Sequence, residues 1–181
     1  MRVSTTSIGD VLIFTPQLFG DERGFFMESF NQQVFNEAVG YDICFVQDNH
    51  SRSSHGVLRG LHYQVPPHEQ GKLVRVSQGC VFDVAVDIRR SSPTFGHWVG
   101  AELSDVNNHQ MWIPPGLAHG FLVLSESADI LYKTTRHYSP QSERALQWND
   151  SDLGIHWPKL ARPIIQSGKD AAALAFHTLT V

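Results

Sequence analysis

The stretch Cys80-Val81-Phe82-Asp83-Val84-Ala85-Val86-Asp87-Ile88 decides the fold class of this chain. Its bulky apolar residues alternate with a second set that includes Asp83 and Asp87, which is the period of two of a β-strand and not the period of a helix. We expect the bulky face to pack against a core and the face that carries both aspartates to be open to water.

Similar short runs rich in Val, Ile, Phe, Tyr and Trp recur along the chain, separated by Gly, Pro, Asn and Ser. This pattern is typical of an all-β sandwich or barrel. Further strands are expected at residues 11–14, 24–30, 44–51, 57–64, 72–77, 98–103, 110–113, 119–124 and 130–137.

Helical pattern is scarce. In Gln32–Val39 the apolar residues Val34, Phe35 and Ala38 recur at one-turn spacing and Gly40 follows as a stop, so a helix is expected there, with a second one near residues 169–175. The chain has 181 residues without a repeat, a low-complexity tract or a flexible linker. These features predict a single domain over residues 1–181, with N- and C-terminal extensions.

The composition excludes several classes of protein. A formal charge of -4 from interspersed charges leaves no basic run for nucleic acid, and no apolar stretch is long enough to span a bilayer. The short polar N-terminus has no signal segment, so we expect a soluble, cytoplasmic protein without nucleic-acid or membrane partners. Cys44 and Cys80 lack a CxxC spacing and lie in apolar surroundings, which predicts buried, reduced thiols.

Two separated segments each bring one histidine to a strand: Arg59-Gly60-Leu61-His62-Tyr63-Gln64 and Pro114-Pro115-Gly116-Leu117-Ala118-His119-Gly120-Phe121. Strict alternation would put Arg59 and His62 on opposite faces, so both reach one site only if the strand is bulged or sharply twisted at Gly60. The residue types alone leave two interpretations open, a catalytic pair or a core histidine beside a surface arginine.

The spelling Pro114-x-Gly116-x-x-His119 resembles the second motif of the cupin superfamily, whose fold is a double-stranded β-helix of the jelly-roll type. Many cupins bind a metal through a His-x-His pair in their first motif. Here that pair reads His62-Tyr63-Gln64, and an amide is a poor ligand for transition metals. We therefore expect a metal-free cupin, with a metal-dependent cupin using His62 and His119 as the competing interpretation.

Without a metal, a side chain must act as the base. His62 has a suitable ordinary pKa, and Asp170 is a candidate partner for its ring. Tyr132 and Tyr138 share strand parity and could face inward as proton donors or stacking rings, or could be ordinary wall residues. Lys72 would be costly to bury unless it met an anion, although most lysines are solvated.

Longer strings around these residues resemble the dTDP-4-dehydrorhamnose 3,5-epimerase family of cupins from about residue 11 to residue 173. The strings are FGDERGFF at 19–26, FVQDNHS at 45–51, GVLRGLH at 56–62, QGKLVR at 70–75, SPTFG at 92–96, IPPGLAHGF at 113–121, LYK at 131–133 and WND at 148–150. Pro115 and Leu117 stand where many relatives have Glu and Phe.

The resemblance implies a homodimeric, cofactor-free enzyme that inverts C3 and C5 of a dTDP-linked 4-keto-6-deoxy sugar. It implies that His62 is the proton acceptor, that Asp170 supports His62, and that Tyr132 is the proton donor. The residues implied to contact the substrate are Arg23, Glu28, Gln47, Asp48, Asn49, Arg59, Lys72, His119, Glu143 and Lys169, with Tyr138 stacked on the thymine. Two alternatives remain, a mono-epimerase acting at C3 or C5 only and a cupin that binds a nucleotide sugar without reaction.

Overall fold

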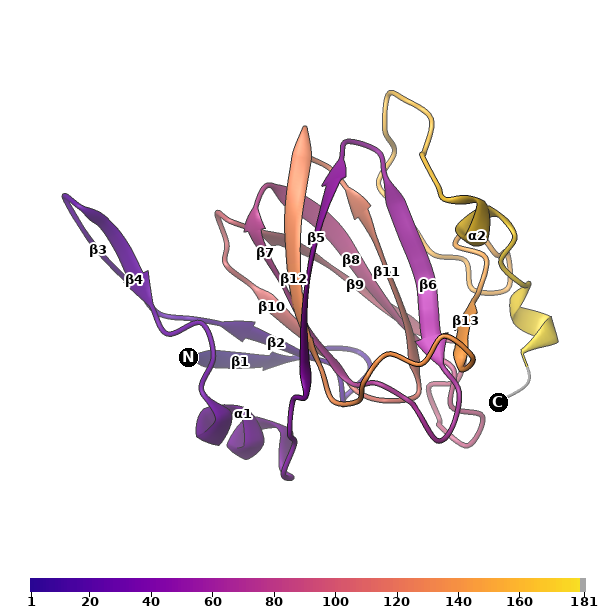
Figure 1. Cartoon of the computed structure of the whole chain (residues 1–181), viewed down its shortest axis with the longest axis horizontal. Helices are drawn as coiled ribbons and strands as arrows, with labels where there is room; N and C mark the ends of the chain where they lie inside the picture. The colour runs from indigo at the N-terminus through magenta and orange to yellow at the C-terminus, as the bar shows by residue number, and fades with distance from the viewer. Residues whose placement is uncertain (180–181) are drawn as a thin grey trace.

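The computed structural model describes residues 1–179, which form two antiparallel sheets and a separate hairpin (Figure 1). The first sheet has the order β1-β2-β10-β7-β12-β5 and the second the order β13-β6-β11-β8-β9. The strands of the first are β1 (Arg2–Thr5), β2 (Leu12–Thr15), β5 (Gln47–Ser54), β7 (Lys72–Gln78), β10 (Gln110–Ile113) and β12 (Ser127–Thr134). Those of the second are β6 (Leu58–Gln64), β8 (Cys80–Asp87), β9 (Trp98–Ser104), β11 (Leu117–Val123) and β13 (Glu143–Ala145).

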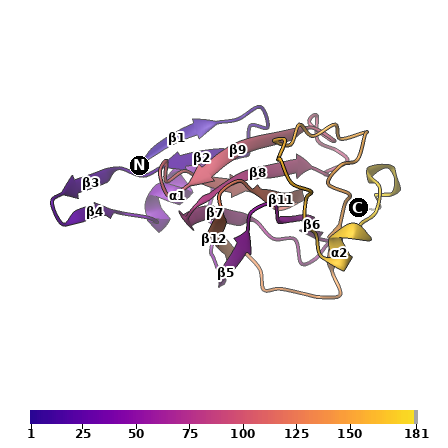
Figure 2. The ribbon, with the colours of Figure 1, turned by 90° about the horizontal axis from the view of Figure 1, so that it is seen from above.

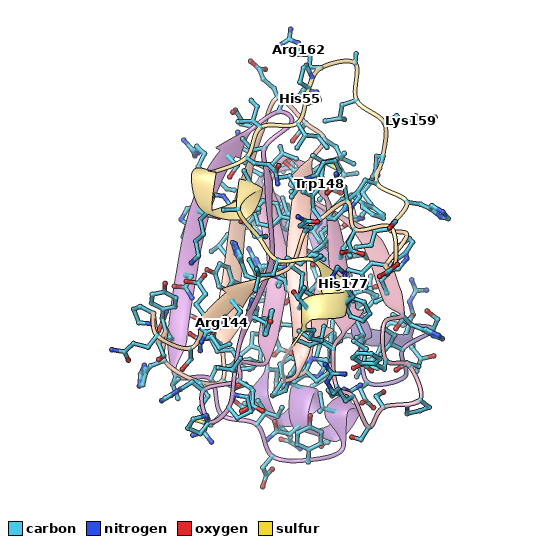
Figure 3. All side chains as sticks on the ribbon, turned by 90° about the vertical axis from the view of Figure 1, so that its right-hand side faces the viewer. His55, Arg144, Trp148, Lys159, Arg162 and His177 are labelled. Carbon is cyan, nitrogen blue, oxygen red and sulfur yellow. The ribbon has the colours of Figure 1, made fainter. Side chains whose placement is uncertain are left out.

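The main core lies between the two sheets. Val74 and Ile130 from the six-stranded sheet and Val81, Ala85 and Phe121 from the five-stranded sheet belong to one buried cluster. Alternate residues of the five-stranded sheet point the other way, into a second cluster. This second cluster is completed by the C-terminal segment, which carries Lys159 and His177 and crosses the outer face of the five-stranded sheet (Figure 3).

Helix α1 (Gln32–Val39) is fixed by its ends and by one aromatic side chain. Asn31 caps its N-terminus by accepting hydrogen bonds from the backbone, and Gly40 ends it in the left-handed conformation at φ 87°. Phe35 is fully buried in a third cluster, with ring centroids 5.3 Å from Phe14 and 5.1 Å from Trp112. The helix therefore covers part of the outer face of the six-stranded sheet.

The hairpin formed by β3 (Leu18–Asp21) and β4 (Gly24–Met27) projects away from both sheets (Figures 1 and 2). Its side chains Phe19, Phe25 and Phe26 are 56%, 61% and 69% exposed. Three exposed phenylalanines on one projecting element form an apolar surface of the kind that marks an interaction site.

The all-β jelly-roll architecture with few, short helices that the sequence predicts is confirmed, and the first helix has the predicted bounds. The second helix, α2 (Gly168–Ala171), is shorter than predicted, and a 3-10 turn, η1 (Phe176–Thr178), follows it. The short elements β1, β3 and β13 were not predicted. β13 has three residues, too few to show a period, and every residue of β1 and β3 is exposed, so no buried apolar face marks these two strands. The predicted domain's last two residues lie outside the described part of the chain.

Two predictions about exposure were wrong. Asp83 and Asp87 are both fully buried, because the face of β8 that carries them is turned toward the space between the sheets and not toward water. Asp87 lies at the end of the strand, next to the loop that follows. Cys44 is exposed and Cys80 is half-buried, so neither is the fully buried thiol that was expected, although both are free. Within residues 1–179, no helix has the length and apolarity needed to cross a membrane.

Replacing Phe35 by Ala should lower the free energy of unfolding by about 3–5 kcal/mol, because it empties the centre of the aromatic cluster under α1. Urea denaturation followed by fluorescence would measure the change. Val106→Ala is the control, since Val106 is 87% exposed and its loss should change stability by less than about 0.5 kcal/mol. Equal effects of the two substitutions would contradict the assigned core.

Candidate functional site

A bulge in β6 brings the two motif histidines together. His62 of β6 pairs with His119 of β11, whereas Arg59 pairs with Phe121, so β6 uses one more residue than β11 over the same distance. Gly60 lies within the extra step at φ 118°, a value that favours glycine. The predicted irregularity at Gly60 is therefore confirmed.

The backbones of β6 and β11 also approach each other closely at this point. A Cβ atom added to Gly60 would lie 2.6 Å from the Cα of Gly120 and 2.6 Å from the carbonyl oxygen of His119. Leu61 and Tyr63 pack into the cluster under the C-terminal segment, so His62 between them points to the opposite side, into the space between the sheets.

His62 is held by Asp170 of α2. Its Nε2 atom lies 2.5 Å from Asp170 Oδ1, and Asp170 is buried. Because a carboxylate accepts hydrogen bonds, Nε2 carries the proton and Nδ1 of the neutral ring is left with a lone pair. Burial lowers the pKa of His62 from its ordinary value, and the charge of Asp170 only partly opposes this effect. The ring is thus kept neutral at neutral pH, with a nitrogen free to accept a proton.

Ser167 fixes the carboxylate of Asp170 and was not predicted from the sequence. It caps the N-terminus of α2 by accepting from the backbone N–H of Asp170, and its hydroxyl donates to Asp170 Oδ2 at 2.7 Å. The signal that could have found it is the spacing Ser167-x-x-Asp170, which is that of a helix capping box.

His119 is held by a second carboxylate, Asp83 of β8. Its Nε2 atom lies 2.8 Å from Asp83 Oδ1, and both side chains are buried. Asp83 was also missed as a functional residue, because its alternation with apolar residues predicted a solvated face. The site therefore contains two His–Asp pairs, and the two histidines belong to neighbouring strands.

Lys72 of β7 approaches these pairs from the six-stranded sheet. Its Nζ atom lies 3.4 Å from the carbonyl oxygen of His62. Burial lowers the pKa of Lys72 to about 8, against the opposing charges of Asp83 and Glu143. Most of the Lys72 side chains therefore carry a positive charge at neutral pH, and the residue is half-buried.

Tyr132 of β12 packs against the main core between the sheets, as its strand parity predicts. Burial raises the pKa of Tyr132, so its hydroxyl stays protonated at neutral pH. The charge of Glu143 acts on His62, Lys72 and Tyr132 alike, which places all three groups around one carboxylate. An imidazole and a phenol thus enter the same space from opposite sheets.

Glu143 of β13 also joins two residues at the mouth of this space. It accepts hydrogen bonds from the Tyr138 hydroxyl and from the Lys169 ammonium. Burial alone would raise the pKa of Glu143, but the hydrogen bonds from Lys169 and Tyr138 outweigh burial and lower it. Tyr138 lies beyond the end of β12 and its ring is half exposed, so its position does not follow from strand parity.

The neighbouring strand β5 adds polar side chains. Asn49 pairs with Tyr132 across the sheet, and the Gln47 amide donates to the Asn49 side chain at 2.9 Å, so both lie on the Tyr132 side. The Asp48 side chain lies on the other side, where it forms an ion pair with Lys133. The structure therefore brings Gln47 and Asn49 to the site but not the Asp48 carboxylate.

Arg59 reaches the same space through the bulge. Its Nε donates to Ser53 of β5 at 3.0 Å. The positive charge of Arg59 lowers the pKa of Tyr132 and so partly opposes the effect of burial on that group.

Arg23 and Glu28 do not lie with the other predicted residues. Arg23 lies at the turn of the projecting hairpin, remote from β6 and α2 (Figure 1), and Glu28 is exposed just after that hairpin. Within one chain, Arg23 is not part of the site.

Gln64 does not take the place of a metal-binding histidine. Its amide nitrogen donates to the carbonyl of His68 at 2.6 Å, and its amide oxygen accepts from the backbone of Ser139. In the described part of the chain, no three His, Cys, Asp or Glu side chains are grouped so that they could hold a metal ion.

Known proteins are similar to this chain over nearly its whole length. A sequence model of the family described as dTDP-4-dehydrorhamnose 3,5-epimerase matches residues 5–178. A dTDP-4-dehydrorhamnose 3,5-epimerase from Shigella flexneri is 62% identical over 170 residues, which cover 94% of this chain and 93% of that protein.

Solved structures are similar over the same length. The dTDP-6-deoxy-D-glucose-3,5-epimerase from Legionella pneumophila Philadelphia 1, in complex with dTDP-4-keto-L-rhamnose, has a TM-score of 0.95 and 52% identity and covers 99% of this chain and 94% of its own. A 3'-monoepimerase from Streptomyces bikiniensis, in complex with dTDP-quinovose, has a TM-score of 0.89 and 34% identity and covers 96% and 87%.

These comparisons confirm the family resemblance and the prediction of an epimerase, an enzyme of the isomerase class. The family model spans nearly the whole chain, and the similarity extends over both sheets and the C-terminal segment. The chain belongs to the dTDP-4-dehydrorhamnose 3,5-epimerase family.

Proposed function

We propose that the protein converts dTDP-4-dehydro-6-deoxy-D-glucose to dTDP-4-dehydro-L-rhamnose by inverting C3 and C5. The observation that carries this proposal is the placement of a basic imidazole, His62, and a protonated phenol, Tyr132, on opposite sheets around one space. Similarity to the epimerase in complex with dTDP-4-keto-L-rhamnose supports the substrate class.

The C4 ketone of the substrate acidifies the hydrogens on C3 and C5. In each half-reaction His62 Nδ1 takes the proton, the electrons of the broken C–H bond form the enolate, and the Tyr132 hydroxyl gives a proton to the opposite face of the carbon. His62 then loses its proton to solvent and the Tyr132 phenolate regains one. Asp170 keeps the imidazole in the tautomer with Nδ1 free.

Lys72 and His119 are proposed to stabilise the negative charge that develops on the C4 oxygen. A cation held in a site with little water acts more strongly on an oxyanion than it would in water. Side chains at the mouth of the site are proposed to bind the nucleotide. They are Gln47, Asn49, Arg59, Tyr138, Glu143 and Lys169.

His62→Asn should slow solvent deuterium incorporation at both C3 and C5 by roughly 10²–10⁴-fold, because the general base is removed. Nucleotide-sugar binding should change little. Proton NMR of the substrate with the enzyme in deuterium oxide measures exchange. His55→Asn is the control, since His55 lies in the turn after β5 (Figure 3) and its ring bonds to the carbonyl oxygens of Leu124 and Ser125. Exchange that persisted at C3 in His62→Asn would assign another base to that carbon.

Tyr132→Phe should separate exchange from inversion. Deprotonation by His62 can continue, but reprotonation then occurs from the original face, so deuterium enters without the new stereochemistry. Tyr63→Phe is the matched control, because the Tyr63 ring is buried in the cluster on the outer side of β6. Product of normal configuration from Tyr132→Phe would remove this tyrosine from the role.

We further propose that the protein is a homodimer in which Arg23 of one protomer completes the site of its partner. The hairpin that carries Arg23 projects away from the site of its own chain, and its exposed phenylalanines would be covered by a second copy. This arrangement would bring Arg23, which the family resemblance implies in substrate binding, to a site that it does not reach within its own chain.

A mixed-dimer experiment tests the shared site. Arg23→Ala and His62→Asn homodimers should both be impaired, but a mixed dimer has one site with a normal His62 and a normal Arg23. Each mixed dimer should therefore have about half of the activity of a normal dimer. Because random pairing of equal amounts makes about half of the dimers mixed, the co-refolded sample should recover about a quarter of normal activity. Light scattering that gave a monomer, or mixed dimers without recovered activity, would contradict the shared site.

A mono-epimerase is the second candidate, favoured by the similarity to the 3'-monoepimerase from Streptomyces bikiniensis. The same NMR experiment separates the two functions. A double epimerase places deuterium at C3 and C5 of the product, whereas a mono-epimerase inverts one of these carbons.

A further inference from the structure

Asp83 is the acidic group of the site that the proposed mechanism does not use. It lies in the middle of β8, is fully buried, and faces the space between the sheets beside Val81 and Ala85. One oxygen, Oδ1, accepts from His119, and the other, Oδ2, is buried without a hydrogen-bond partner among residues 1–179. A buried carboxylate oxygen with no donor is costly unless a nearby positive charge compensates for it.

The nearby positive charge is Lys72. It stands on β7, in the sheet that faces β8, and its ammonium has one hydrogen bond in the described chain, a long one to the His62 carbonyl. The charge of Asp83 is the strongest of the two charges that oppose the burial of Lys72, the other being that of Glu143. Asp83 therefore bonds to one histidine, and its charge favours the ammonium form of one lysine on the facing sheet.

We propose that Asp83 is a positioning residue for the epimerisation. Its Oδ1 atom holds His119 in the Nε2-protonated form, and its Oδ2 atom provides the negative charge that keeps Lys72 an ammonium. This inference rests on the proposed function, in which Lys72 and His119 face the enolate oxygen. Asp83 acts on the substrate through these two residues and does not contact it.

Few titratable groups lie around Lys72 and can affect its charge. Across its own sheet the paired residues are Ile113 and Thr134, which do not titrate. From the opposite sheet and its edge, the groups that act on Lys72 are Asp83 of β8, Glu143 of β13 and His62 of β6. His119 bonds to Asp83, whose charge acts on Lys72. The charge of Glu143 acts on both Tyr132 and Lys72.

The substitution Asp83→Asn isolates the charge from the geometry. The asparagine oxygen can still accept from His119 Nε2, so the imidazole keeps its orientation while the negative charge is removed. The pKa of Lys72 should then fall further below about 8, by roughly one unit, because a nearby opposite charge favours the charged form. Asp129→Asn is the control, since Asp129 is a buried carboxylate that bonds to Arg52.

The first test needs no substrate. The chain has four lysines, so ¹³C-labelled lysine signals can be assigned by substitution and followed by NMR through a pH titration. The Lys72 midpoint should move to lower pH in Asp83→Asn and stay in place in Asp129→Asn. An unchanged midpoint in Asp83→Asn would overturn the proposal.

The second test uses the reaction. The kcat/KM for deuterium exchange should fall at high pH, because Lys72 loses its proton there. In Asp83→Asn this fall should begin about one pH unit lower. The variant should be close to normal at low pH and about tenfold slower at high pH. A uniform loss at all pH values would indicate a merely structural role and overturn the proposal.

A third measurement uses the unaltered protein and covers the case in which Asp83→Asn fails to fold. Nitrogen-15 NMR of His119 should show a proton on Nε2 throughout the pH range of the folded state. An unprotonated Nε2 would overturn the assigned hydrogen bond. If the unaltered enzyme showed no exchange, the proposed function would fail, whereas the lysine titration would still decide whether Asp83 controls Lys72.

Discussion

The contact between Gly60 of β6 and Gly120 of β11 is the constraint on which the site depends. No side chain fits between the two backbones, and the extra residue in β6 turns His62 into the space between the sheets. The same step lets Arg59 enter that space instead of facing away from it. A regular strand with these residues would place one of the two side chains on the wrong face.

Electrostatics then determine what the enclosed groups can do. The carboxylates of Asp83, Asp170 and Glu143 lie around the two histidines, and each accepts a hydrogen bond from a side chain of the site. Burial moves the pKa of His62 down and that of Tyr132 up, so at neutral pH one is a free base and the other a protonated acid. Two groups with opposite tendencies in one space suit a reaction that removes a proton on one face and returns it on the other.

The C-terminal segment has a double role. It covers the outer face of the five-stranded sheet (Figure 3) with apolar side chains. It also carries α2, whose Asp170 bonds to His62. The capping of α2 by Ser167 and the orientation of Asp170 are one set of hydrogen bonds. Local helix formation and placement of the carboxylate are therefore coupled.

The sequence by itself determined the all-β class, the helix at Gln32–Val39, the irregularity at Gly60 and, through its resemblance to a family, the group of residues around His62. These features follow from local periodicity and from strings of neighbouring residues. Only the tertiary structure decided that Asp83 is buried against His119, that Ser167 holds Asp170, and that Arg23 lies away from its own site. The physical reason is that burial and pairing depend on what the opposite sheet places across the core, and alternation along one strand does not contain that information.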